Sequence, residues 1–172
     1  MLYIKKGNIL HIVPREIMKA EEVIEQMDAK RALFGLFFAF HNRLQAAGDS
    51  FYEEITCKQF FLLACLNLFD ENPPTANEIA EVMGCSRQSV KEILTSLEKK
   101  QFIELVPDEK DMRKKRIVAT ENAVVLGKKY SKREVDFFET LYDGISDREI
   151  KSTFRVVSHL EKNLIKIKEN LL

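Results

Sequence analysis

The sequence predicts a mainly α-helical protein with one small β-hairpin, arranged as a winged helix-turn-helix between N- and C-terminal dimerisation helices. Capping boxes, in which a Ser or Thr is followed three residues later by Glu or Gln, open helices at Thr56/Gln59, Thr75/Glu78 and Ser146/Glu149. Two short β-prone runs, 102–106 and 116–119, lie on either side of a loop directly after a helical segment. That loop, 107–115, is rich in Lys and Arg, which is typical of the wing of a DNA-binding domain.

The composition suits one compact domain with helical arms. The chain has 172 residues, of which 45% are apolar and 31% charged, enough to bury a core. Its longest apolar run, 32–40, is far below the roughly 20 residues that span a bilayer, and the N-terminus has no signal-peptide cleavage pattern. Three cysteines, Cys57, Cys65 and Cys85, fit reduced thiols better than a disulfide framework. We therefore expect a cytoplasmic protein without a membrane partner.

Charge is unevenly distributed although the formal net charge is zero. Residues 1–85 carry 8 Lys/Arg against 12 Asp/Glu, residues 86–116 carry 9 against 6, and residues 117–172 carry 10 against 9. The middle segment is the only clearly basic one. A local basic surface, more than the total charge, is what nucleic-acid binding requires.

Three helices are expected before the basic segment. A long helix over 15–46 should end at Gly48. The segment 57–69 is apolar around most of its circumference, which indicates a buried central helix. A short helix over 76–83 should end at Gly84 in a left-handed cap.

The next helix is amphipathic and begins the basic segment. Ser86 is its expected N-cap, and the helix runs to about Lys100. Apolar residues recur at spacings of three and four on one face, while polar and basic residues fall away from it. The apolar face is Val90, Ile93, Leu94 and Leu97, and the other face includes Arg87, Gln88, Lys91 and Thr95.

Two further helices complete the chain, over 121–141 and from Asp147 onward, with a break at 143–144. The last one carries a heptad-like seam that one copy of the chain has nothing obvious to bury against, so we expect a homodimer. The seam is Val157, Leu160, Leu164, Ile167 and Leu171. The predicted division has four parts: an N-terminal extension with the start of the first helix, to which the sequence assigns no role (1–29), a first dimerisation helix and loop (30–55), a DNA-binding lobe (56–120) and C-terminal dimerisation helices (121–172).

Motifs in the basic segment match a known pattern: Leu-Glu-Lys-Lys at 97–100, Asp-Met-Arg at 111–113 and Ile-Val-Ala-Thr at 117–120. With the order of helices, the chain resembles the MarR (multiple-antibiotic-resistance regulator) family of bacterial and archaeal transcription factors over residues 33–172. It departs from the family at Gln101, where Gly is usual, at Met112, where a basic residue is common, and at Ala119, where Leu is usual. The expected wing arginine is present. At a left-handed position, Gln101 would lower stability by under about 1 kcal/mol relative to Gly.

Candidate DNA contacts fall into two groups. The first lies at the start of the proposed recognition helix, where side chains reach base edges in the major groove: Ser86, Arg87, Gln88, Ser89 and Lys91, with Arg87 and Gln88 as candidates for base readout. The resemblance implies that Arg113, at the wing tip, enters the minor groove while Asp111 orients its guanidinium. The remaining wing cations would contact phosphates: Lys110, Lys114, Lys115 and Arg116.

Each of these assignments has a plainer alternative. Taken alone, a run such as 113–116 is usually a solvated charged loop, and its position after a helix-turn-helix is what favours DNA contact. Cys85, in the turn before the recognition helix, is either a thiol switch or simply a small turn residue, and the second is favoured. Phe37, Phe38 and Phe60 are candidates for a pocket that binds a small aromatic or amphipathic effector, although core packing also explains them.

No sequence motif indicates an enzyme or a cofactor. The chain has no glycine-rich phosphate loop, nucleophile elbow or His-Glu metal motif, and its three histidines lack metal-ligand spacing. The function we expect is a sequence-specific regulator, a ligand-relieved repressor that binds a palindromic operator in double-stranded DNA as a homodimer. The alternative is a winged-helix dimer used for protein contacts, with little DNA affinity.

Overall fold

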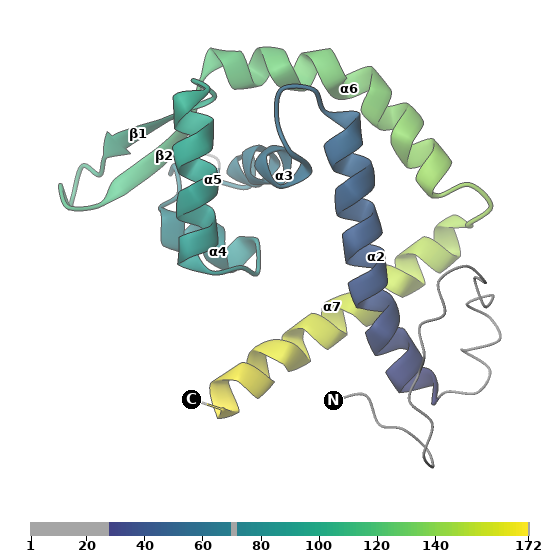
Figure 1. Cartoon of the computed structure of the whole chain (residues 1–172). Helices are drawn as coiled ribbons and strands as arrows, with labels where there is room; N and C mark the ends of the chain where they lie inside the picture. The colour runs from purple at the N-terminus through teal and green to yellow at the C-terminus, as the bar shows by residue number, and fades with distance from the viewer. Residues whose placement is uncertain (1–27, 70–71, 172) are drawn as a thin grey trace, which may run out of the picture. The chain divides into compact units, whose positions relative to one another are not determined.

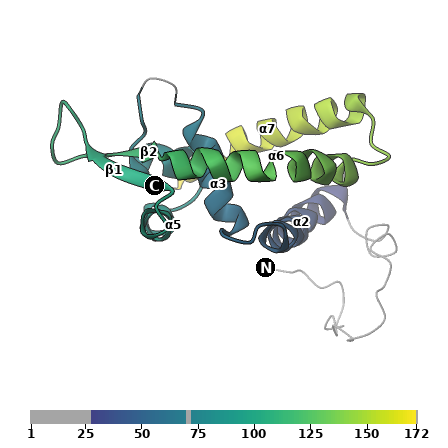
Figure 2. The same ribbon diagram turned by 90° about the horizontal axis from the view of Figure 1, so that it is seen from above.

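The computed structural model describes residues 28–69 and 72–171 (Figures 1 and 2). Its elements, in chain order, are α2 (Ala29–Phe51), α3 (Cys57–Leu66), α4 (Ala76–Val82), α5 (Arg87–Lys99), β1 (Ile103–Pro107), β2 (Lys115–Ala119), α6 (Glu121–Leu141) and α7 (Asp147–Asn170). The chain divides into two compact units, residues 1–61 and 62–172. The predicted mainly helical fold with a two-stranded wing is confirmed.

The first unit contains α2 and the start of α3, and here one prediction is wrong. The long helix does not end at Gly48 but continues to Phe51. Gly48 is buried, and a Cβ built on it would lie 2.4 Å from the Sγ atom of Cys57. The Asp49 carboxylate accepts a hydrogen bond of 2.7 Å from the backbone N–H of Cys57. Gly48 therefore permits close approach of two chain segments, and the helix passes through it. The expected start of this helix near residue 15 lies outside the described residues.

Helix α3 begins at the predicted capping box, because Thr56 and Gln59 exchange backbone-to-side-chain hydrogen bonds of 3.1 and 3.2 Å. It ends at Leu66, three residues earlier than predicted, and residues 67–68 form a turn. The helix is buried on one side of the single chain, through Leu62, Leu63, Cys65 and Leu66, whereas Phe61 and Ala64 are exposed. Burial around most of its circumference is therefore not observed.

The second unit holds the helix-turn-helix. Helix α4 has the predicted capping box at its start, and Gly84 follows its end with a positive φ of 63°. The backbone N–H groups of Gly84 and Cys85 donate to the carbonyls of Glu81 and Ala80, which satisfies the open end of the helix. Helix α5 then buries the predicted apolar stripe, with Val90, Leu94 and Leu97 inside.

Helix α5 ends in the left-handed turn that the sequence predicts. Gln101 has a φ of 61°, and its N–H and that of Phe102 donate to the carbonyls of Glu98 and Leu97. The carbonyl of Gln101 accepts hydrogen bonds from the Thr120 hydroxyl, at 2.7 Å, and the Asn122 amide, at 3.3 Å. The turn therefore ties the end of α5 to the start of α6.

Strands β1 and β2 pair antiparallel, with Ile103 opposite Ala119 and Leu105 opposite Ile117. Ile103 and Ile117 are buried and anchor the base of the hairpin in the core. The N–H of Ile117 also donates to the carbonyl of Pro74, at 2.8 Å, so β2 is bonded to the segment that precedes α4. The wing is thereby joined to the helix-turn-helix through backbone as well as side chains.

Helices α6 and α7 have the predicted limits, and Gly144 lies between them with a φ of 74°. Leu126 and Tyr130 of α6 are buried. Helix α7 starts with the predicted capping box at Ser146 and buries none of its residues. Within residues 28–69 and 72–171, no helix is long and apolar enough to cross a membrane.

Candidate DNA-binding surface

The start of α5 is organised by two serines. The Ser86 hydroxyl accepts a hydrogen bond of 3.1 Å from the N–H of Ser89, and the two hydroxyls lie 2.9 Å apart. Ser86 is therefore the helix N-cap, as predicted. Both side chains are exposed, so the cap lies on the surface of the lobe.

The polar face of α5 presents the predicted base-reading residues to solvent. Arg87, Gln88 and Lys91 are all exposed. The Gln88 amide nitrogen donates a hydrogen bond of 3.0 Å to the carboxylate of Glu92, one turn further along. The amide nitrogen carries two hydrogens, so this bond orients the side chain and leaves one donor for a base. In the part of the chain that the structure describes, Arg87 and Lys91 have no ion-pair partner.

The wing loop is organised by a carboxylate that the sequence analysis did not single out. Asp108 is buried, and its Oδ1 atom accepts hydrogen bonds from the N–H groups of Lys110 and Asp111, at 2.9 and 2.8 Å. The Asp108 N–H donates to the carbonyl of Lys114, at 3.0 Å, which closes the loop. Its Oδ2 atom accepts from the guanidinium Nε of Arg116. Only a spacing of eight residues to an arginine across a hairpin loop would have signalled this pair in the sequence.

Arg116, one of the predicted phosphate contacts, is bonded within the protein. Besides the bond to Asp108, its Nη1 atom donates to the carbonyl of Pro73, at 3.0 Å, and lies 3.3 Å from a carboxylate oxygen of Glu78. Its side chain is only 27% exposed. These bonds direct the guanidinium toward the protein and make it less accessible than the exposed cations of the wing.

Asp111, predicted to orient Arg113, lies beside it in the wing loop. Its Oδ1 atom accepts from the backbone N–H of Arg113, at 3.2 Å, and its Oδ2 atom lies 3.7 Å from the ammonium group of Lys114. Asp111 thus shapes the loop through the backbone of Arg113. Lys110, Arg113 and Lys115 are exposed, and the described part of the chain offers them no ion pair.

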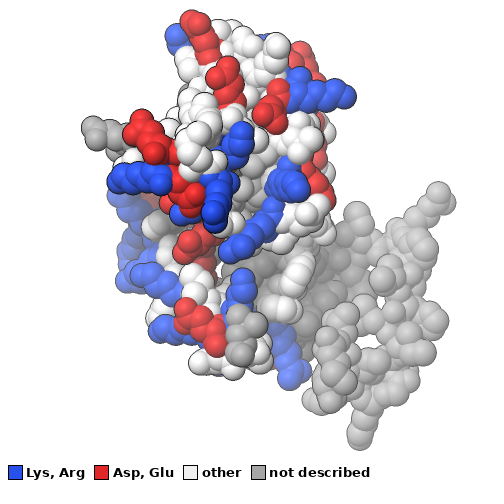
Figure 3. Space-filling model, turned by 90° about the vertical axis from the view of Figure 1, so that its left-hand side faces the viewer, with Lys and Arg blue, Asp and Glu red and all other residues white. Residues whose placement is uncertain are grey.

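The face that includes the wing carries Lys and Arg side chains interleaved with carboxylates (Figure 3). Two carboxylates of the lobe have lowered pKa values. The hydrogen bond from Arg116, followed by that from the Asp111 N–H, lowers the pKa of Asp108. The backbone and hydroxyl hydrogen bonds from Thr75 lower the pKa of Glu78, and Arg116 adds to the effect. Both acids stay charged at neutral pH and hold Arg116 between them.

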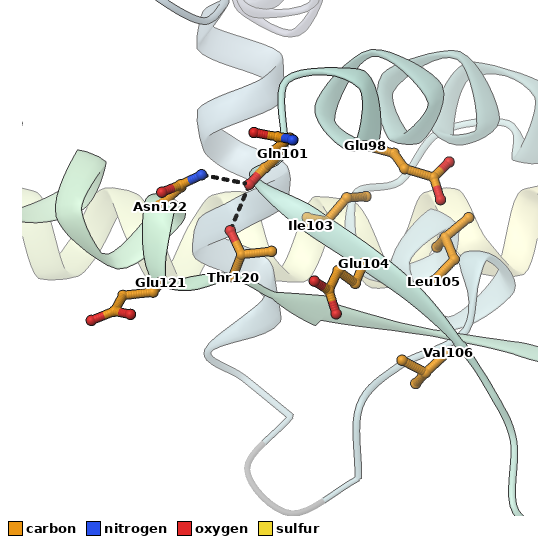
Figure 4. A pocket seen from close by; sticks show the side chains of 9 residues that line it. All are labelled: Glu98, Gln101, Ile103, Glu104, Leu105, Val106, Thr120, Glu121 and Asn122. Atoms are coloured by element: carbon orange, nitrogen blue, oxygen red, sulfur yellow. Dashed lines mark hydrogen bonds between the residues drawn. The ribbon is translucent and has the colours of Figure 1, made fainter.

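Two hollows lie beside the hairpin. One, of about 650 Å³, is open toward solvent between the end of α5, β1 and the start of α6, and carries three glutamates (Figure 4). Its lining is Glu98, Gln101, Ile103, Glu104, Leu105, Val106, Thr120, Glu121 and Asn122. The other, of about 430 Å³, lies between the start of α4 and β2 and is lined by residues 75–78 and 114–116.

The predicted effector residues lie on α2 and α3. Phe60 is partly buried and stacks on Tyr52, with ring centroids 4.5 Å apart. Phe38 is 62% exposed and packs edge-on against Phe34, while Phe37 is 36% exposed. Neither hollow beside the hairpin contains these phenylalanines.

The predicted dimerisation residues of α7 lie largely open to solvent in the single chain. Leu164 and Leu171 are 62% and 80% exposed, Val157 and Ile167 are also exposed, and Leu160 is partly covered. The additional apolar residues Phe154, Val156 and Ile165 are exposed on the same helix.

The segment that contains α3, α4, α5 and most of the hairpin matches a known protein family. Residues 55–115 match the model of the MarR family. This segment is therefore a winged helix-turn-helix of the MarR type. Among curated proteins, none gives a significant match.

Solved structures share the fold at low sequence identity. The MepR–DNA complex of S. aureus is 23% identical, with a TM-score of 0.67 over 74% of this chain and 95% of that one. A MarR/EmrR family transcriptional regulator from Acinetobacter sp. ADP1 is 17% identical, with a TM-score of 0.71 over 81% and 99%. PcaV of Streptomyces coelicolor, solved with its natural ligand, is 18% identical, with a TM-score of 0.61 over 72% and 89%.

The match gives the general function of the lobe. The matched family is one of DNA-binding transcriptional regulators and not of enzymes. The winged helix-turn-helix at residues 55–115 is the part that carries the family match.

Proposed function

We propose that this MarR-family protein is a ligand-responsive repressor that acts in the cytoplasm as a homodimer on a palindromic operator. Residues 56–120 form the DNA-binding lobe, and residues 30–55 and 121–172 supply the dimer contacts. A repressor needs only to bind its operator and exclude competing proteins. This chain has one surface suited to DNA binding and another suited to pairing with a second copy.

The proposal rests on exposed cations of α5 and of the wing that have no ion-pair partner among the described residues. Arg87 and Lys91 on α5, and Lys110, Arg113 and Lys115 on the wing, are exposed and have no ion pair among the described residues. Lys114, whose partner Asp111 lies 3.7 Å away and is itself partly exposed, is a further candidate. Cations that are not committed within the protein can neutralise phosphates and release counterions, which supplies most of the affinity for DNA.

The residues of α5 and those of the wing contact different parts of the DNA. The start of α5, with Ser86, Arg87, Gln88, Ser89 and Lys91, faces the major groove and reads bases. Arg113 enters the minor groove from the wing, and Lys110, Lys114 and Lys115 contact phosphates. The backbone bond from Asp111 to Arg113 sets the loop from which that arginine extends.

Pairing of two copies explains the uncovered apolar side of α7. Val157, Leu164, Ile167 and Leu171 are all exposed in the single chain, and large exposed apolar patches mark interaction sites. The dimer contacts are Val157, Leu160, Leu164, Ile167 and Leu171. A two-fold dimer presents two recognition helices about one DNA turn apart, roughly 34 Å, and so matches a palindrome.

The ligand response is assigned to the aromatic surface of α2 and α3, at Phe37, Phe38 and Phe60. A partly buried stack such as Phe60 on Tyr52 offers flat apolar area to an aromatic or amphipathic effector. The solved structure of PcaV with its natural ligand is a precedent for ligand binding on this fold.

The test compares DNA binding by the wild-type protein with Arg87→Ala and Arg113→Ala, using the DNA upstream of its own reading frame and a scrambled duplex. Arg87→Ala should weaken the specific complex more than the scrambled one, because it removes a base contact. Arg113→Ala should weaken binding and reduce the salt slope by about 1. Lys162→Ala, which removes an exposed cation from α7, is the matched control and should leave both unchanged. Equal, weak retention of both duplexes by every protein would favour a protein-contact module instead.

A further inference from the structure

We propose that Arg116 is the positioning residue of the wing: it braces the hairpin against the start of the helix-turn-helix, with Asp108 as its counter-ion, and does not contact DNA. The inference rests on the proposed DNA-binding function and specifies how the wing is held relative to α5. If Arg116 has this role, the buried carboxylate of Asp108 is required for DNA binding although it lies on the DNA-binding lobe.

Arg116 joins three separate parts of the lobe. Its Nε atom bonds to Asp108 at the start of the wing loop, and its Nη1 atom bonds to the Pro73 carbonyl, 43 residues away in the sequence. The same nitrogen lies 3.3 Å from Glu78 on α4. A planar guanidinium suits this task because its donors point in fixed directions, whereas a lysine ammonium has no such geometry.

Each partner of Arg116 is itself fixed in place. Glu78 accepts hydrogen bonds of 2.7 and 2.8 Å from the N–H and hydroxyl of Thr75, so it caps α4 while it holds Arg116. Asp108 accepts the N–H groups of Lys110 and Asp111, which form the start of the wing tip. The position of the wing tip is therefore set by the same bonds that begin α4.

The hairpin needs this brace. An isolated two-stranded hairpin is marginally stable in water. Backbone hydrogen bonding to the rest of the lobe near the wing comes through the Ile117 N–H and the Pro74 carbonyl, at the base of β2. Beyond that point the loop over 108–114 carries the proposed contacts of Lys110 and Arg113, so a tilt at the base would displace them.

The deciding experiment uses Asp108→Asn, because positioning and simple electrostatics predict opposite signs. Removing a negative charge from a DNA-binding face should strengthen binding if charge alone matters. If Asp108 positions the wing through Arg116, binding should weaken by about tenfold, the effect of losing one charge-assisted hydrogen bond. Glu109→Gln is the matched control: its carboxylate is exposed on the same loop, and its loss should strengthen binding slightly.

A double-mutant cycle then separates positioning from direct contact. If Arg116 acts through the wing, Arg116→Gln should cost less once Arg113→Ala has removed the minor-groove contact than it costs in the wild type. Additive losses in the double mutant would show that Arg116 binds phosphate itself and would overturn the inference. So would an Asp108→Asn protein that binds as tightly as Glu109→Gln.

Amide hydrogen exchange at Ile117 supplies a readout that does not depend on DNA. Faster exchange there in Asp108→Asn, with unchanged exchange at Leu94 in α5, is the expected result, and equal protection in the mutant and the wild type contradicts the brace. Absence of DNA binding by the wild-type protein would defeat the proposed function while leaving this measurement interpretable.

Discussion

Gly48 provides a sharp test of the packing between α2 and the start of α3. Replacing it by Ala would place a Cβ atom 2.4 Å from Sγ and 2.7 Å from Cβ of Cys57. Ordinary contacts between such atoms lie at about 3.5–4.0 Å, so Cys57 must move by roughly 1 Å or more. It is not free to do so, since its N–H is bonded to Asp49 and it begins the helix that Thr56 caps.

The expected size follows from two opposing effects. Ala is favoured over Gly inside a helix by about 0.5–1 kcal/mol, and insertion of a methyl group into a packed site costs about 1–3 kcal/mol. We expect Gly48→Ala to lower the free energy of unfolding by roughly 1–2 kcal/mol. Gly35→Ala, in the same helix with no atom within 4 Å of the new Cβ, should raise it by about 0.5–1 kcal/mol.

Urea unfolding of the wild type and both variants, at one protein concentration, measures the two effects. Cys57→Ala in the Gly48→Ala background should recover only part of the loss, because the close contact with the Cys57 Cβ atom remains. If both glycine variants stabilise the protein equally, the described approach of α2 to α3 is incorrect.

Three further predictions concern the lobe. Gln101→Gly should raise the free energy of unfolding by about 0.5–1 kcal/mol, because Gly adopts the observed φ of 61° without strain. Lys100→Gly, at a φ of −83°, should lower the free energy of unfolding. Thermal unfolding of the two variants distinguishes these outcomes. Ser86→Ala should destabilise the protein by about 1 kcal/mol through loss of the α5 cap, and a Ser86→Asp variant that keeps the cap should retain stability in the same assay. Because the folded pKa of Asp108 is depressed, its contribution to stability is complete above its unfolded value of about 4 and is lost as pH falls through the lower folded value. Exchange at the Asp111 amide should therefore be steady from pH 8 to 5 after correction for intrinsic rates and lose protection below about 4, and the same loss in Asp108→Asn would contradict the assignment.

Local signals in the sequence predicted most of the fold. The capping hydroxyls of Thr75 and Ser146 bond to groups three residues away, so their partners are visible in the sequence. The left-handed turn at Gln101 followed from its place in a helix-ending motif, even though Gln is a poor residue for that conformation.

The errors arose where long-range contacts decide the outcome. Gly48 looked like a helix stop because glycine often ends helices, but its role is set by Cys57, which packs against it from the next helix. Arg116 looked like one more wing cation, yet its Pro73 and Glu78 partners lie 43 and 38 residues away. No periodicity or spacing within the basic loop distinguishes Arg116 from Arg113.

The most direct test of DNA recognition by this lobe is the salt dependence of binding by the wild-type protein, measured by fluorescence anisotropy on its own upstream DNA and on a scrambled duplex. We expect the protein to bind the upstream DNA tightly and in preference to the scrambled duplex. The logarithm of the binding constant should fall steeply and linearly with the logarithm of the salt concentration. Weak binding with a shallow salt slope and no preference between the two duplexes would contradict this expectation.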